Sequence, residues 1–147
     1  MMISTKGRYA LRVMAALATD SSGAMVPLKD IAHRQEISEK YLEAIIKELV
    51  RANLVIGVRG KGGGYRLAKR PEEYTVKEIL EAAEGSLAPV ACMEIEGDRK
   101  PCPRAGRCIT LPIWQGLDRL IQDYFSGITL AQLIEQVNGQ GASAADI

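Results

Sequence analysis

The residues of this sequence best suited to chemistry are its three cysteines, which occur in one short segment. Cys92, Cys102 and Cys108 are separated by nine and five residues, among prolines, glycines and charged side chains where no core element is expected. Buried free cysteine usually occupies the core of a helix or strand instead. Thiolates are soft ligands that suit iron–sulfur clusters, zinc or copper(I). The spacing allows all three sulfurs to converge on one centre, which favours a metal or cluster site over three unremarkable thiols.

Other interpretations of the cysteine segment stay open. Its spacing is not the paired Cys-x-x-Cys of zinc knuckles, yet a zinc-stabilised module or a plain thiol sensor would use the same residues. An iron–sulfur cluster usually takes four ligands, so with three cysteines the fourth ligand is unknown. A backbone group, a small thiol or one of four side chains could complete the site: His33, Glu94, Glu96 and Asp98.

A glycine-rich basic stretch upstream of the cysteines predicts a β-hairpin. In residues 54–67, two short apolar runs flank the sequence Gly-Lys-Gly-Gly-Gly at positions 60–64. Glycine relieves the steric penalty of positive φ at a hairpin tip. No acidic residue occurs from Leu54 to Arg70. An isolated hairpin of this kind could be an ordinary solvated turn, but a basic hairpin also suits a phosphate backbone or a narrow groove.

The residues before the hairpin predict two helices joined by a short turn. The first runs from about Leu28 to Arg34, and Ser38 is a good N-cap for the second, which ends near Ala52. A helix-turn-helix followed by a basic hairpin is typical of a winged helix, which places the second helix in the major groove of DNA. The second helix has a predicted buried stripe of Leu42, Ile45, Ile46, Leu49 and Val50. The predicted DNA contacts are Ser38, Lys40, Tyr41, Glu43, Arg59, Lys61, Gly62 and Arg66.

Further helices are expected on both sides of these elements. Residues 5–19 have a helical apolar stripe of Ala10, Val13, Met14 and Leu17. Thr75 and Glu78 form a capping box for a helix that ends near Gly85, and Thr129 and Gln132 form another for a last short helix.

A long helix is expected after the cysteine segment, with Thr110 as its cap and Ser126 near its end. Little of the chain is left to cover its apolar stripe. We interpret this stripe as a symmetric dimer interface rather than as packing on the first helix, because two-fold proteins match two-fold operators. The interface residues are Ile113, Leu117, Leu120 and Tyr124.

The overall composition fits one domain with an appended arm. The 147 residues are 47% hydrophobic, and the fold class is mainly α with a small β-hairpin wing. We expect a winged helix-turn-helix domain at 1–85, a cysteine loop at 86–110, a dimerisation helix and final short helix at 111–137, and a flexible tail at 138–147. There is no apolar run of 18 residues and no apolar signal core, so we expect a cytoplasmic protein without a membrane partner.

Charge and histidine content narrow the function. Residues 1–70 contain 13 basic and 6 acidic side chains, a net charge of +7, whereas residues 71–147 contain 6 basic and 12 acidic ones, a net charge of −6. The first half is therefore suited to a polyanion. No Ser–His–Asp or Cys–His set is readable, and the single histidine leaves little for acid–base catalysis, so we expect no enzyme.

Four segments resemble the Rrf family of bacterial winged-helix repressors, the IscR/CymR/NsrR group, over nearly the whole chain. They are Ser-Thr-Lys-Gly-Arg-Tyr-Ala at 4–10, Ile-Ser-Glu-Lys-Tyr-Leu-Glu at 37–43, Val-Arg-Gly-Lys-Gly-Gly-Gly-Tyr at 58–65, and Ile-Thr-Leu-Ala-Gln-Leu at 128–133. The resemblance implies a homodimeric transcription factor that binds double-stranded, palindromic DNA. It also implies contacts from Tyr41 and Glu43 of the recognition helix, Arg59 near the minor groove, and a dimerisation helix from Leu111.

The resemblance is strongest to the cysteine-containing members, and it implies an iron–sulfur cluster on Cys92, Cys102 and Cys108, with two-iron and four-iron types both open. Cluster regulators often have a histidine at the position of Leu111, and others an acidic residue at that of Arg8, so the fourth ligand does not transfer. Some branches lack the cysteines and respond through an enzyme of cysteine synthesis. The alternatives are a cluster-free thiol- or partner-responsive regulator of sulfur metabolism, an iron–sulfur carrier and a zinc-stabilised module.

Overall fold

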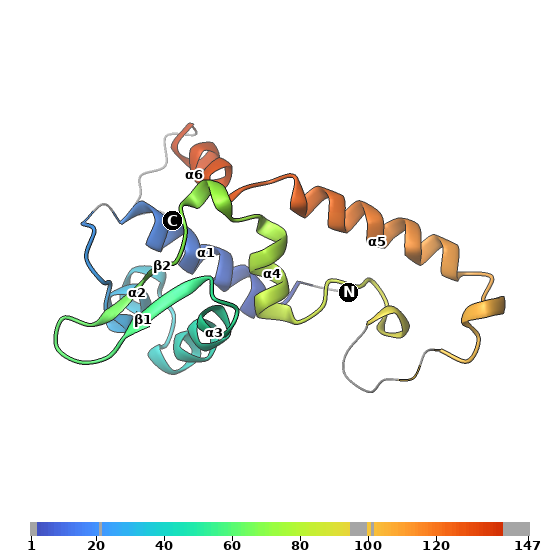
Figure 1. Cartoon of the computed structure of the whole chain (residues 1–147), viewed down its shortest axis with the longest axis horizontal. Helices are drawn as coiled ribbons and strands as arrows, with labels where there is room; N and C mark the ends of the chain where they lie inside the picture. The colour runs from blue at the N-terminus through green and yellow to red at the C-terminus, as the bar shows by residue number, and fades with distance from the viewer. Residues whose placement is uncertain (1–2, 21, 95–99, 101, 140–147) are drawn as a thin grey trace.

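The chain folds into helices around one antiparallel hairpin. The computed structural model describes residues 3–20, 22–94, 100 and 102–139. The helices and strands are α1 Thr5–Thr19, α2 Leu28–Gln35, α3 Glu39–Arg51, β1 Val55–Val58, β2 Gly64–Leu67, α4 Val76–Glu84, α5 Leu111–Ser126 and α6 Leu130–Gly139. Three single 3-10 turns join them: η1 Pro71–Glu73, η2 Ala91–Met93 and η3 Ala105–Arg107. The predicted fold class, mainly α with a small hairpin wing after a helix-turn-helix, is confirmed (Figure 1).

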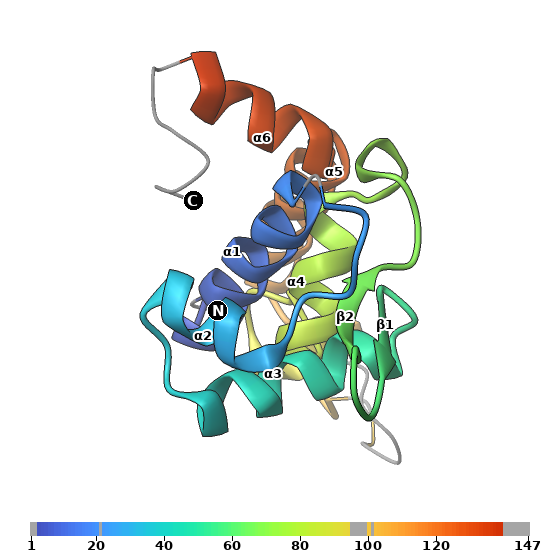
Figure 2. The same ribbon diagram turned by 90° about the vertical axis from the view of Figure 1, so that its left-hand side faces the viewer.

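Helix α1 lies at the centre of the main core, between α4, α6 and the helix-turn-helix (Figure 2). Ser4 caps it by accepting a hydrogen bond from the Gly7 amide. Its stripe is buried as predicted. The buried side chains of that stripe are Ala10, Val13, Met14 and Leu17.

The start of α1 is joined to the end of α4 by one carboxylate. Oε1 of Glu84 accepts hydrogen bonds from the Ser4 amide at 2.9 Å, the Gly7 amide at 3.0 Å and the Ser4 hydroxyl at 2.7 Å. A Cβ atom at residue 7 would overlap this oxygen, so glycine is required for the contact. An acidic group at a helix N-terminus is also favoured by the helix dipole.

The two ends of the hairpin are joined by a buried tyrosine. The Tyr74 hydroxyl donates to the Leu54 carbonyl at 2.7 Å and accepts from the Lys69 amide at 2.8 Å, so it connects the two ends of the hairpin. On its outer edge β2 pairs with Val26, whose amide and carbonyl both bond to Tyr65. These contacts set the direction in which the hairpin leaves the core.

The C-terminal helices behave differently from each other. Helix α5 has no buried residue, and its first half extends away from the rest of the structure (Figure 1). Its second half packs Ile121 and Phe125 on a small cluster formed by Val76, Leu80 and Leu87. Helix α6 then returns to the main core, where Leu130 is fully buried.

Two capping boxes occur as predicted. The Thr75 hydroxyl accepts from the Glu78 amide at 3.1 Å, while the Glu78 carboxylate accepts from the Thr75 amide at 2.9 Å. The reciprocal pair of Thr129 and Gln132 begins α6 in the same way. These local patterns were sufficient to locate the starts of α4 and α6.

Two predictions about side chains were wrong. Val50 is 37% exposed rather than buried, because it borders the open space between α3 and the hairpin. Thr110 has helical backbone angles and makes no side-chain cap to α5. Its hydroxyl lies 3.3 Å from the sulfur of Cys108 instead.

Candidate nucleic-acid interface and cysteine segment

The first turns of α3 present a polar, exposed surface. Ser38 is the N-cap and accepts from the Tyr41 amide at 3.2 Å. The opposite face of α3 is buried in the core, which leaves the predicted contact residues pointing outward. The exposed residues are Ser38, Lys40, Tyr41 and Glu43.

The hairpin tip presents the second group of predicted contacts. Gly60 and Gly62 have φ angles of +97° and +77°, which L side chains rarely adopt, and no atom lies near where their Cβ atoms would be. The tip is therefore a tight turn with an open approach to the backbone. Its predicted contact residues are exposed: Arg59, Lys61, Gly62 and Arg66.

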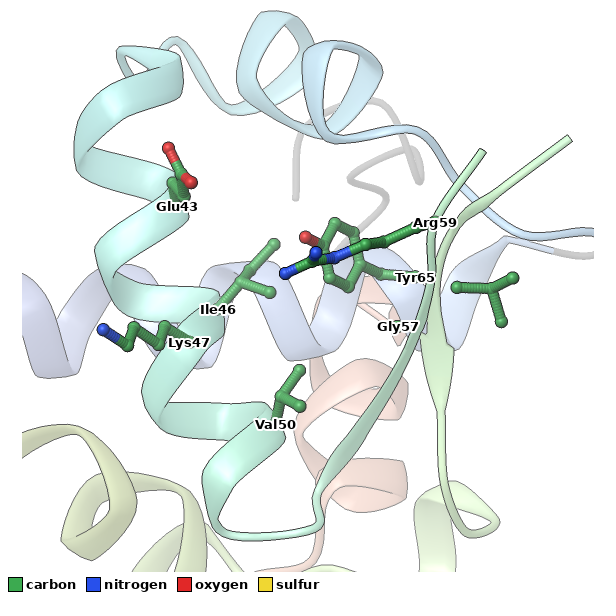
Figure 3. Close-up of a pocket in the computed structure, with 8 residues that line it drawn as sticks. Glu43, Ile46, Lys47, Val50, Gly57, Arg59 and Tyr65 are labelled. Carbon is green, nitrogen blue, oxygen red and sulfur yellow. The ribbon is translucent and has the colours of Figure 1, made fainter. Parts of the chain in front are cut away.

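A groove of about 420 Å³ separates α3 from the hairpin. Figure 3 shows Arg59 reaching from the hairpin toward α3, with Tyr65 beside it. Gly57 allows this arrangement, since a Cβ at that position would lie 2.9 Å from the Tyr65 ring. The structure thus brings Glu43 and Arg59 to opposite sides of one groove.

Sequence reasoning did not identify six residues that line this groove. Val50 was assigned to the core, and the alternation along the two strands gave no reason to select Val58 or Tyr65. Lys47 lies one helical turn after Glu43, so helical spacing could have found it. The six residues are Ile46, Lys47, Val50, Gly57, Val58 and Tyr65.

The basic side chains of this face are available to a polyanion. Within the part of the chain that the structure describes, the ion pairs involve other basic residues, whereas the predicted basic contacts form none. Unpaired cations on one face are the electrostatic signature of a nucleic-acid surface. The basic contacts are Lys40, Arg59, Lys61 and Arg66.

The three cysteines lie outside both hydrophobic clusters, on the chain between α4 and α5. Cys92 is exposed, Cys102 and Cys108 are half-buried, and all three are free thiols. The hydrogen bond with the Thr110 side chain lowers the pKa of the Cys108 thiol below its ordinary value. The described residues bring no three His, Cys, Asp or Glu side chains close enough together to hold one ion.

The candidate fourth ligands are placed as follows. His33 is exposed on α2, and Glu94 follows η2 directly. Glu96 and Asp98 lie outside the described residues. The structure therefore does not bring His33 together with the cysteines within the described chain.

A comparison with models of protein families shows the family to which this architecture belongs. Residues 3–136 match the model of the Rrf2 family, described as an iron-dependent transcriptional regulator. The chain belongs to the Rrf2 family. The helix-turn-helix and hairpin described above are its winged helix, and the protein is a transcriptional regulator and not an enzyme.

Similar proteins include regulators named IscR and a regulator named CymR. The HTH-type transcriptional regulator IscR of Aliivibrio salmonicida is 39% identical over 134 residues, which cover 91% of this chain and 77% of that protein. The structure of T. potens IscR superposes with a TM-score of 0.74 at 32% identity, covering 97% of this chain and 93% of that one. The structure of CymR, the global cysteine regulator of B. subtilis, superposes with a TM-score of 0.71 at 33% identity, covering 92% and 98%.

The cysteine segment of this Rrf2 protein fits a cluster in the chemistry of its donors. Three thiols on one surface segment are soft ligands that iron–sulfur clusters use, and none of them is held in the core or in a disulfide.

Among the described residues no helix is long and apolar enough to cross a membrane.

Proposed function

We propose that this Rrf2 protein is a homodimeric, cytoplasmic regulator that binds a palindromic operator and responds to iron–sulfur cluster or redox status. Residues 1–85 would bind DNA, residues 86–110 would respond to cluster or redox status, and residues 111–137 would form the interface between two protomers. The observation that carries this proposal is the open groove between α3 and the hairpin, which Glu43 and Arg59 line from opposite sides. Helix α3 would enter the major groove, and Arg59 would follow the adjacent minor groove.

The DNA-binding part is tested by selecting duplexes from a random pool with purified protein and measuring affinity by fluorescence anisotropy at fixed salt. We expect Arg59→Ala to weaken binding to the selected duplex by about 1–3 kcal/mol, or roughly 5- to 150-fold. Arg70→Ala is the matched control, because Arg70 is equally charged but lies beyond the hairpin, beside Glu73. An equal loss of affinity in both variants would mean that Arg59 contributes to DNA binding only through its charge.

The sensing part assigns Cys92, Cys102 and Cys108 as the ligands of a cluster. A bound cluster would supply an oxygen- and redox-sensitive group, and its fourth ligand stays open. The segment that holds these thiols is fixed at its start, where Leu87 is buried beside α4. We expect the DNA affinities of anaerobic and air-exposed protein to differ by about 1–3 kcal/mol, the usual range of such coupling. Equal affinities, with Cys92→Ala also unchanged, would remove the sensing proposal.

A second candidate is favoured by the likeness to CymR. The similar B. subtilis protein is a cysteine regulator, and the cysteines of this chain do not gather within the described residues. This chain could then regulate sulfur metabolism through a free thiol or a partner protein. The anaerobic absorption spectrum, with iron and sulfide counts per chain, separates the two candidates. Colourless protein without iron would favour the second.

A further inference from the structure

Arg12 of α1 is bound to the end of α2, immediately before the turn of the helix-turn-helix. Its Nε donates to Oε1 of Gln35 at 3.0 Å, and its Nη2 donates to the Gln35 carbonyl at 2.6 Å. Gln35 is the last residue of α2 and is 2% exposed. One guanidinium therefore fixes both the side chain and the backbone at this point.

The same side chain is connected to the start of α3. The Arg12 guanidinium lies over the Tyr9 ring, 5.0 Å from its centroid. The Tyr9 ring in turn meets the Tyr41 ring edge to face, with centroids 5.9 Å apart and an interplanar angle of 73°. Tyr41 is in the first turn of α3, so this brace of Gln35, Arg12, Tyr9 and Tyr41 reaches both sides of the turn.

The turn itself contains a residue in the left-handed region. Glu36 has a φ angle of +53°, a left-handed conformation that residues with a side chain rarely adopt. Its amide and that of Ile37 bond back to α2, to the carbonyls of His33 and Ala32. These bonds end α2. The contacts of α1 with Gln35 and Tyr41 lie on either side of the turn, one directly before it and one in the first turn of α3.

We propose that Arg12 is a positioning residue for DNA recognition, which sets base discrimination by holding the start of α3 at one orientation. The inference rests on the proposed function, since it assumes that α3 reads bases. Arginine is required because its planar fork can donate to two acceptors at once and lie over an aromatic ring, whereas lysine is a single point charge. Arg12 is also exposed, so direct contact with a phosphate is the alternative that the test must separate.

The test compares Arg12→Lys and Arg12→Ala with Arg8→Lys. Arg8 is a matched control because it is exposed on the same helix and, among the described residues, its side chain donates to the nearby Thr5 hydroxyl at 3.0 Å. The first measurement is amide hydrogen exchange of the full chain without DNA. We expect faster exchange at residues 36–41 in both Arg12 variants, and unchanged exchange in α4 and in the Arg8 variant. Unchanged exchange at residues 36–41 would overturn the inference.

The second measurement compares the affinity for two duplexes. One is the duplex selected by the wild-type protein, and the other is the single-base variant of it that the wild type binds most weakly. We expect the affinity ratio of these two duplexes to fall on the order of tenfold in Arg12→Lys, since a well-oriented base contact discriminates by about 1–3 kcal/mol. The dependence of affinity on salt should not change. A normal ratio in Arg12→Lys, with a shallower salt dependence in Arg12→Ala, would make Arg12 a phosphate contact and overturn the inference.

These two measurements distinguish failure of the inference from failure of the proposed function. If the wild-type protein selects no duplex, the proposed function fails, and the role of Arg12 in discrimination fails with it. Altered exchange in that case would still show that Arg12 orders the turn. If the wild type selects a duplex but the Arg12 variants discriminate normally, only the inference fails.

Discussion

Helices α3 and α5 both have an apolar stripe, but the α3 stripe is buried and the α5 stripe is exposed. In α3 the stripe residues Leu42, Ile45, Ile46 and Leu49 are at most 1% exposed. In α5 the stripe residues are between 41% and 69% exposed: Ile113, Leu117, Leu120 and Tyr124. The winged region therefore closes its core within one chain, whereas α5 has an apolar face, from Ile113 to Tyr124, that the described residues do not cover.

This difference separates what stabilises the monomer from what can join two copies. Contiguous apolar surface of this kind marks interaction sites in soluble proteins. Ile109, two residues before α5 begins, is also 92% exposed. Substitutions in α3 should change folding stability, and equivalent substitutions in α5 should change association.

The largest expected effect comes from placing a charge on the α5 face. In the proposed dimer, Leu117→Asp would bury an unpaired carboxylate, so we expect a cost of about 3 kcal/mol or more and a dimer dissociation constant raised at least about 100-fold. Sedimentation equilibrium measures this. Gln115→Asp is the control, since residue 115 is exposed on the opposite side of the same helix. Wild-type protein that is monomeric would contradict the dimer proposal.

The next effect compares the same substitution in the two helices. Leu49→Ala removes a fully buried side chain and should lower the free energy of unfolding by about 2–5 kcal/mol. Leu120→Ala removes a side chain that is 69% exposed, so any loss should depend on protein concentration. Urea titrations at two concentrations check both. A concentration-independent loss of similar size in Leu120→Ala would mean that α5 is covered within the monomer.

The smallest expected effect on stability comes from removing one tyrosine hydroxyl, either at the base of the hairpin or on the α5 face. Tyr74→Phe removes the hydroxyl that the Lys69 amide donates to, and it leaves the Leu54 carbonyl with the Ala68 amide alone, so we expect it to cost about 1–3 kcal/mol of stability. Tyr124→Phe on the exposed α5 face should change monomer stability by less than about 0.5 kcal/mol. Thermal unfolding of both variants gives the comparison. Equal shifts would show that the Tyr74 hydroxyl does not anchor the hairpin.

Sequence patterns predicted most of the fold because its helices carry local signals. The capping boxes at Thr75 and Thr129 and the stripe of α1 depend on residues three or four positions apart. The hairpin was equally readable, since its glycines adopt positive φ. For the same reason, the exposed residues of α3 and the hairpin tip could be selected as candidate contacts before their arrangement was known.

The remaining features depend on contacts between distant residues, which no local pattern contains. The carbonyl that Tyr74 binds is 20 residues away in the sequence. Gln35, the partner of Arg12, is 23 residues away. The exposure of Val50 follows from the groove, which exists only once the hairpin stands beside α3. The arrangement of the three cysteines is not predicted by their spacing either.

The carboxylate of Glu84 at the start of α1 has a consequence for how such regulators diversify. It anchors the chain just before residue 85, and the packing of Ile121 and Phe125 anchors it again within α5. We expect that the stretch between these two anchors can change in length without moving the winged helix. If that stretch senses a signal as proposed, one DNA-binding region could be combined with different sensors.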